Sequence, residues 1–168
     1  MFDFLKRNKK DNEMNVTEFD LYAMVDGQLI MIDEVKDPVF AQKMMGDGFA
    51  FIPDNGDVQA PCQGEVLNVF PSKHAIALKY SDVEILLHFG IDTVALDGLP
   101  FDVKVQEGDM VSSNTKLIDI DLQSIKDAEK DDVVIVIFTN GNETIENLVI
   151  NEYGPVSKGD LIGKVILK

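Results

Sequence analysis

The stretch HAIALKYSDVEILLHF, residues 74–89, decides the fold. It holds two apolar runs, residues 74–80 and 83–89, which are separated by Ser81 and Asp82. Short runs rich in β-branched and aromatic residues, bounded by turn residues, predict β-strands. The stretch therefore predicts an antiparallel hairpin with one histidine near each of its open ends, His74 and His88.

The rest of the chain continues this pattern. From about Thr17 onward, short apolar stretches alternate with Asp-Gly, Asn-Gly and Pro-containing turns, a spacing typical of an all-β sandwich or barrel. Further strands are predicted at residues 29–35, 66–70, 133–138 and 161–167. Only residues 122–130 predict a short helix, which Asp121 can cap. We expect an all-β fold, an antiparallel β-sandwich with one or two short helical turns.

Two segments of the chain echo each other. VQEGDMV, residues 105–111, and VSKGDLI, residues 156–162, both place a charged residue, Gly and Asp before an apolar strand. Such a turn suits the corner of a hairpin. A duplicated sandwich motif and a coincidence of common turn residues both account for the echo.

Length and charge set the broad class of protein. The 168 residues fit one domain, which we place at residues 16–168 after a flexible leader at residues 1–15. A weak amphipathic membrane anchor is the alternative for this leader, because Lys6, Arg7, Lys9 and Lys10 follow its first apolar residues. The formal charge of −15 repels phosphate backbones, so nucleic-acid binding is not expected. We expect a monomer.

Cys62 is the only cysteine, so neither an internal disulfide nor a cysteine-based zinc site can form. Its predicted role is packing rather than redox sensing. No apolar run approaches the roughly 20 residues that cross a bilayer. These features predict a soluble protein in the reducing cytoplasm.

The register of the hairpin determines where the two histidines lie. A three-residue connection, residues 80–82, sets His74 opposite His88 on one face of the sheet. A two-residue turn would place the two rings on opposite faces, because a slip of one residue reverses every side chain. We expect the three-residue connection, with Asp82 in the left-handed conformation that it needs.

Two adjacent imidazoles suit a transient metal site, an acid/base pair, or a nucleophile beside a group that binds what it receives. The chain has no HExxH, HxH, GxSxG, P-loop or GxGxxG motif, which disfavours resident zinc, serine hydrolase and nucleotide chemistry. We expect no required cofactor. A transient zinc ion shared by His74, His88 and a carboxylate of a partner protein stays open.

Residues 83–94, VEILLHFGIDTV, resemble the phosphorylation-site signature of the glucose-type enzyme IIA of the bacterial phosphoenolpyruvate-dependent sugar phosphotransferase system. The similarity extends through DPVFAQKMMGDG (37–48), APCQG (60–64) and SKHA (72–75), and so covers the chain from about residue 20 to its end. It implies a β-sandwich with a duplicated hybrid motif.

The resemblance also implies a function. Such a protein accepts a phosphoryl group from the histidine-containing phosphocarrier protein and passes it to the IIB domain of a glucose-family sugar permease. It would be a phosphotransferase component that works through a phosphohistidine. The alternative is a regulatory binding module whose capture of non-permease partners is gated by phosphorylation.

The matching positions imply individual roles. His88 would be phosphorylated, His74 would contact the phosphoryl oxygens, and the carbonyl of Gly90 would fix the tautomer of His88. Ser72 stands where the family usually has Thr, as the hydroxyl partner of His74. The family usually has Gly at the position of Asp82 and a connection one residue longer, so a compensating bulge is expected to keep the two rings together.

The remaining signature residues are interpreted as a docking surface for two partner proteins. We expect an apolar collar around the histidines, with two carboxylates at its edge that meet basic residues of the partners. The apolar collar consists of Val39, Phe40, Met44, Met45, Phe70, Leu86 and Val94; the carboxylates are Asp37 and Asp92. The alternatives are core packing for the apolar residues and turn chemistry for the carboxylates.

Overall fold

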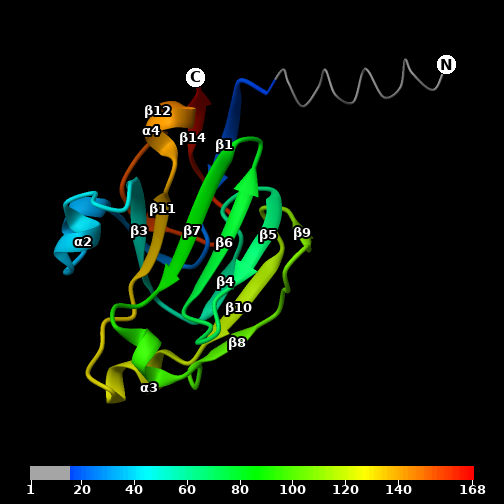
Figure 1. Ribbon diagram of the computed structural model, residues 1–168. Helices are drawn as coiled ribbons and strands as arrows, with labels where there is room; N and C mark the ends of the chain where they lie inside the picture. The colour runs from blue at the N-terminus through cyan, green and yellow to red at the C-terminus, as the bar shows by residue number, and fades with distance from the viewer. Residues whose placement is uncertain (1–15) are drawn as a thin grey trace.

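The computed structural model describes residues 16–168, so the predicted leader lies outside the described residues. An eight-stranded sheet has the order β13-β2-β3-β11-β7-β6-β5-β9, and two three-stranded sheets have the orders β1-β14-β12 and β4-β10-β8. Neighbouring strands are antiparallel throughout. The fold is the predicted antiparallel β-sandwich (Figure 1).

The strands of the large sheet are β2 (Gly27–Met31), β3 (Asp47–Pro53), β5 (Gly64–Val69), β6 (Ala75–Tyr80), β7 (Val83–Phe89), β9 (Met110–Val111), β11 (Val134–Phe138) and β13 (Gly154–Val156). Those of the small sheets are β1 (Glu18–Tyr22), β4 (Asp57–Gln59), β8 (Phe101–Val103), β10 (Lys116–Ile120), β12 (Ile145–Ile150) and β14 (Leu161–Leu167).

The helical segments are short. They are η1 (Ile32–Glu34), α2 (Pro38–Ala41), η2 (Thr93–Leu96), α3 (Leu122–Asp127) and α4 (Gly141–Thr144). The predicted helix is α3, in which the Asp121 carboxylate accepts the backbone N–H of Ser124 at 3.2 Å. It ends earlier than expected, before Glu129, which has a left-handed φ of 60°. The other helical turns interrupt loops, and η1 follows directly where the predicted strand at residues 29–35 ends at Met31.

The echoing segments form equivalent turns. In the first, the carboxylate of Asp109 accepts the N–H of Gln106, and Gly108 has a φ of 93°. In the second, the carboxylate of Asp160 accepts the N–H of Ser157, and Gly159 has a φ of 92°. Each turn also exchanges two backbone hydrogen bonds with one residue of an earlier segment, Val66 for the first turn and Ala23 for the second. The echo in the sequence is therefore a repeated local structure, as a duplicated motif predicts.

Side chains of β7 alternate between the two faces of the large sheet. Val83, Ile85, Leu87 and Phe89 enter the main core, which the large sheet encloses with the two small sheets. Leu86 belongs to a second, smaller apolar cluster on the opposite face, together with residues of η1, α2, β3 and β11. Because period-2 alternation continues along the strand, His88 emerges on this second face, away from the main core.

Candidate phosphoryl-transfer site

The hairpin of β6 and β7 has a different register from the expected one. Ala75, not His74, lies opposite His88, and Tyr80 lies opposite Val83. The connection is therefore the two-residue turn of Ser81 and Asp82, and the predicted three-residue connection is wrong. The left-handed conformation falls on Ser81, with a φ of 54°, rather than on Asp82. No bulge interrupts the pairing of these two strands.

His74 nevertheless lies beside His88: it directly precedes the first residue of β6, and its carbonyl accepts the N–H of Phe89 at 2.7 Å. A turn closed by the hydrogen bond from the N–H of Lys73 to the carbonyl of Phe70, 2.7 Å, leads into it. Lys73 has a left-handed φ of 57°, which reverses the chain just before the histidine. The left-handed Lys73, rather than a bulge in the strands, accompanies the placement of the two imidazole rings side by side.

The two imidazole rings contact each other nearly at right angles. Their centroids are 5.3 Å apart and their planes meet at 78°. Phe40 packs against His88 at 5.0 Å, and Phe70 packs edge-on against His74 at 5.6 Å. Both histidines are half-buried, so each ring is held by neighbours and still reaches solvent.

A backbone carbonyl fixes the tautomer of His88. Its Nδ1 lies 2.7 Å from the carbonyl oxygen of Gly90, which can only accept a hydrogen bond. In the neutral ring Nδ1 therefore carries the proton and Nε2 carries the free lone pair. This hydrogen bond lies where the sequence analysis expects it.

The surroundings of both rings favour the neutral form. Burial lowers the pKa of His88 below its usual value; the hydrogen bond to Gly90 and the carboxylates of Asp37 and Asp92 oppose this effect, and His74 adds to it. Burial also lowers the pKa of His74. Near neutral pH, His88 therefore offers a nitrogen lone pair rather than a cation.

Ser72 does not form the predicted hydrogen bond with His74. Nδ1 of His74 is buried and has no hydrogen-bond partner. Ser72 lies within the turn between Phe70 and Lys73, and packs beside Gly98 through its carbonyl oxygen. No hydrogen bond joins the Ser72 hydroxyl to His74, so the predicted role of hydroxyl partner is not seen in this structure.

Both predicted carboxylates lie close enough to His88 to influence its charge, and both serve turns. The carboxylate of Asp37 accepts the N–H of Val39 at 2.9 Å and caps α2. Asp92 has a left-handed φ of 60°, precedes η2, and makes no side-chain capping bond. The carboxylate of Asp92 is therefore exposed and free of a local partner, whereas that of Asp37 is shared with the helix cap.

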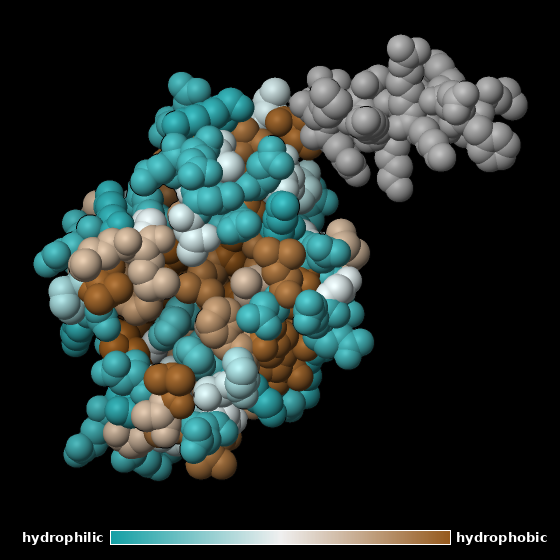
Figure 2. Space-filling model, viewed as in Figure 1, coloured by the Kyte–Doolittle hydropathy of each residue, from teal (hydrophilic) through white to brown (hydrophobic). Residues whose placement is uncertain are grey.

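The predicted apolar collar divides into exposed and buried members. Val39, Met44, Met45 and Val94 are exposed, and Phe70 is half-buried. Figure 2 shows hydrophobic side chains gathered over the middle of the face that carries β6, β7 and α2, within a largely hydrophilic surround.

Phe40 and Leu86 do not belong to the exposed part. Only 6% of Phe40 and 8% of Leu86 are accessible, and both lie in the second apolar cluster. Their role is to support the site from below: Phe40 contacts the ring of His88 directly. The core-packing alternative is correct for these two residues.

One apolar residue of this face was missed by sequence reasoning. Ile52 is exposed and lies on the same face as His88, since Ala50 pairs with Ile135 and Ile135 pairs with His88. Alternation along β3 places Ile52 on the face of Ala50. In the sequence, Ile52 is recognisable only as an apolar residue two positions after Ala50. That it shares a face with the histidines becomes clear only from the strand order β3-β11-β7.

Within residues 16–168, no third His, Cys, Asp or Glu groups with His74 and His88 to hold a metal ion. A shared zinc ion would need its remaining ligands from a partner protein, so it stays a prediction. Cys62 is buried, and burial raises the pKa of its thiol to about 12, which agrees with a packing role.

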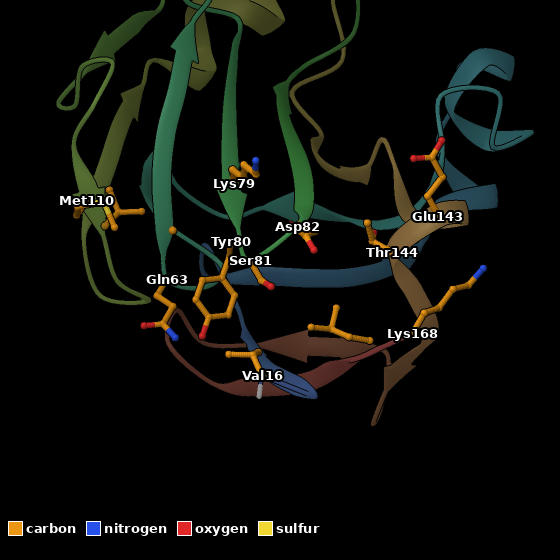
Figure 3. A pocket seen from close by; sticks show the side chains of 13 residues that line it. Val16, Gln63, Lys79, Tyr80, Ser81, Asp82, Met110, Glu143, Thr144 and Lys168 are labelled. Carbon is orange, nitrogen blue, oxygen red and sulfur yellow. The ribbon is translucent and has the colours of Figure 1, made fainter. Parts of the chain in front are cut away.

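An open pocket lies away from the two histidines. It has a volume of about 1130 Å³ and is formed where the turn of β6 and β7 meets the end of β14 (Figure 3). Lys79, Ser81 and Asp82 line it, at the end of β7 opposite to His88. It therefore contributes nothing to the histidine site.

Comparisons with known proteins show the family to which the chain belongs. A family described as "phosphoenolpyruvate-dependent sugar phosphotransferase system, EIIA 1" matches residues 19–144. The glucose-specific EIIA component of Staphylococcus epidermidis is 41% identical over 161 residues, which cover 95% of either chain. The glucose-specific EIICBA component of Streptococcus pneumoniae is 42% identical over 149 residues, which span 88% of this chain and 20% of that longer protein.

A solved structure shows the same fold. The glucose permease IIA of Mycoplasma capricolum superposes with a TM-score of 0.77 at 39% identity, covering 88% of this chain and 95% of the other. No helix of the described residues is long and apolar enough to cross a membrane. The chain belongs to the EIIA 1 family of the phosphoenolpyruvate-dependent sugar phosphotransferase system, whose members are phosphotransfer proteins.

Proposed function

We propose that this protein carries a phosphoryl group on Nε2 of His88, accepting it from the histidine-containing phosphocarrier protein and giving it to the IIB domain of a sugar permease. The observation that carries this proposal is the hydrogen bond between Nδ1 of His88 and the carbonyl of Gly90, which leaves Nε2 as the nucleophile beside a second imidazole. Relatives named glucose-specific support a permease of the glucose class.

The transfer is balanced without a cofactor. The bond between phosphorus and a histidine nitrogen of the donor breaks, and a bond from phosphorus to Nε2 of His88 forms. The proton on Nδ1 stays in its hydrogen bond with Gly90 during this step. Because the broken bond and the new bond are of the same kind, the group stays transferable, and the site needs mainly to position and stabilise the transferring oxygens.

His74 is suited to stabilise those oxygens. Its Nδ1 is buried and cannot reach a ligand, so Nε2 is the nitrogen that can donate to a phosphoryl oxygen. Phe70 packs edge-on against this ring and limits its rotation. A donor held in place before the reaction stabilises developing charge without reorganisation.

The exposed members of the apolar collar are suited to receive both partners. Methionine side chains adapt to different surfaces, and the exposed methionines and valines bury apolar area when a partner binds. The exposed carboxylate of Asp92 supports a partner that presents basic side chains. We propose that this exchange takes place in the cytoplasm, where a single buried cysteine and no disulfide are appropriate.

The direct test is incorporation of phosphate. The purified protein is incubated with phosphoenolpyruvate, enzyme I and the phosphocarrier protein, and the product is mapped by mass spectrometry at neutral pH. We expect one acid-labile, alkali-stable phosphoryl group on His88 and none in H88A. A folded wild-type protein that takes up no label, or takes it up on another residue, would refute the proposal.

A further inference from the structure

The Gly90 carbonyl that fixes the His88 tautomer belongs to a turn that is held on several sides. Gly90 has a φ of 79° and directs its N–H to the carbonyl of Val133 at 2.7 Å. The N–H of Ile91 is bound by the carbonyl of Asp131 at 3.0 Å. The loop that precedes β11 therefore restrains both peptide N–H groups that flank Gly90.

The carbonyl of Phe89 is restrained by a side chain. The hydroxyl of Thr93 donates to it at 2.5 Å, from four residues further along the chain. The N–H of Phe89 donates in turn to the carbonyl of His74 at 2.7 Å. Phe89 thus connects the segment of His74 to the turn that holds His88, and Thr93 binds its one remaining polar group.

Thr93 itself is unusual in its surroundings. It is fully buried, whereas most buried residues of the described chain are apolar. Its methyl group lies directly under Gly90: a Cβ placed on that glycine would stand 2.4 Å from Cγ2 of Thr93 and 2.7 Å from the carbonyl oxygen of Asp131. Both branches of the threonine side chain therefore contact the turn, the hydroxyl through Phe89 and the methyl through Gly90.

We infer that Thr93 is a positioning residue for phosphoryl transfer: its hydroxyl fixes the Phe89–Gly90 peptide so that the Gly90 carbonyl faces Nδ1 of His88. The effect of Thr93 on phosphoryl transfer rests on the proposed function, whereas its effect on the tautomer of His88 does not. Thr93 does not reach the reacting atoms. It acts through the Phe89–Gly90 peptide, which directly precedes the Gly90 carbonyl that selects which nitrogen of His88 carries the proton.

Removing the hydroxyl has a specific expected effect. In T93V the branched shape under Gly90 is kept, while the carbonyl of Phe89 loses its side-chain donor. The Phe89–Gly90 peptide is then held only by the hydrogen bond from the Gly90 N–H to Val133, so it can tilt and shift the Gly90 carbonyl away from Nδ1 of His88. Since that hydrogen bond raises the pKa of His88, its loss lowers the pKa further, and the imidazole is free to place its proton on Nε2.

The experiment compares three variants with the wild-type protein. T93V removes the hydroxyl, T93S keeps it and removes the methyl, and T144V is the matched control. Thr144 also donates its hydroxyl to a backbone carbonyl, that of Asn140 at 3.0 Å, next to the opposite end of β7. The ¹⁵N shifts of the His88 ring report its tautomer and pKa in each folded protein, and the labelling rate reports transfer.

We expect T93V to lose the pure Nδ1–H tautomer, to titrate His88 at lower pH, and to slow labelling by about 10–100-fold. T93S and T144V keep the wild-type tautomer and pKa. A folded T93V with an unchanged tautomer, pKa and labelling rate overturns the inference. If the wild-type protein takes up no label, the proposed function fails, and the tautomer in T93V still decides the role of Thr93.

Discussion

Replacing Gly90 with alanine tests how tightly the structure confines the turn beside His88. The new Cβ would stand 2.4 Å from Cγ2 of Thr93 and 2.7 Å from the carbonyl oxygen of Asp131. Neither neighbour can yield easily, because Thr93 is fully buried and the Asp131 carbonyl is hydrogen-bonded to Ile91. The turn must therefore shift, and the Gly90 carbonyl must shift with it.

The expected loss of folding stability in G90A has two contributions. An alanine at a φ of 79° costs about 1–2 kcal/mol for its left-handed backbone. Forcing a methyl group into a filled site costs about 1–3 kcal/mol more. Gly108 supplies the control, since it has a φ of 93° and nothing within 4 Å of an added Cβ. We therefore expect about 2–5 kcal/mol of destabilisation in G90A and about 1–2 kcal/mol in G108A.

Urea unfolding of both variants, followed by circular dichroism, measures this difference, and the labelling assay measures its consequence. G90A should lose both stability and most of its labelling rate, whereas G108A should lose only stability. Equal destabilisation by the two substitutions would show that the contacts with Thr93 and Asp131 cost nothing. If folded G90A is labelled at the wild-type rate, the geometry of the turn does not control phosphoryl transfer, and the reasoning fails.

Three further predictions concern the histidines and the docking surface. H74Q should still accept a phosphoryl group but pass it on more slowly; equal loss of both half-reactions, measured separately by quench-flow, would contradict the role of His74. Both histidines should titrate by NMR below the usual value of about 6.5, so the stability that their neutral forms contribute is complete above that pH. It is lost as the pH falls from about 6.5 toward their lowered pKa values, because the unfolded chain is protonated first. A loss of stability below pH of about 6.5, measured by urea unfolding, that is no smaller in the H74Q/H88Q double variant would contradict this assignment. M44E should raise the KM for the phosphocarrier protein with little change in the urea midpoint. M110E is the control and should leave this KM unchanged, although Met110 is as exposed as Met44, at 74% against 69%. Equal KM values in the two variants would exclude Met44 from docking.

The strands of this fold could be predicted well wherever local pattern alone determines them. β7 and β14 begin and end at the predicted residues, and α3 begins after its predicted cap, Asp121. Alternation and capping act over a few residues, so the sequence contains all the information that they need. The end of β2 at Met31 was not predicted, because the apolar residues Ile32 and Val35 serve the second cluster from a helical turn.

The candidate site was harder to predict, because its geometry depends on contacts between distant segments. The pairing of the two imidazoles was confirmed, yet for the wrong reason: the turn at Ser81 has two residues, and the left-handed Lys73 brings His74 to its place. Conformations of single loop residues leave little trace in composition or periodicity. The same applies to Ser72, whose hydroxyl role depended on the course of that loop.

The exposed apolar surface that we propose to receive two proteins in turn also risks binding other copies of this protein. The net charge of −15 opposes that risk, since two copies that approach face to face repel each other while a partner with basic side chains is drawn in. The exposed apolar residues near the histidines thus favour binding, while the net negative charge of the chain disfavours contact between two copies of it. With the proposed function, the protein would stay dispersed at high concentration and still meet its partners quickly, with an encounter rate that falls as salt is added.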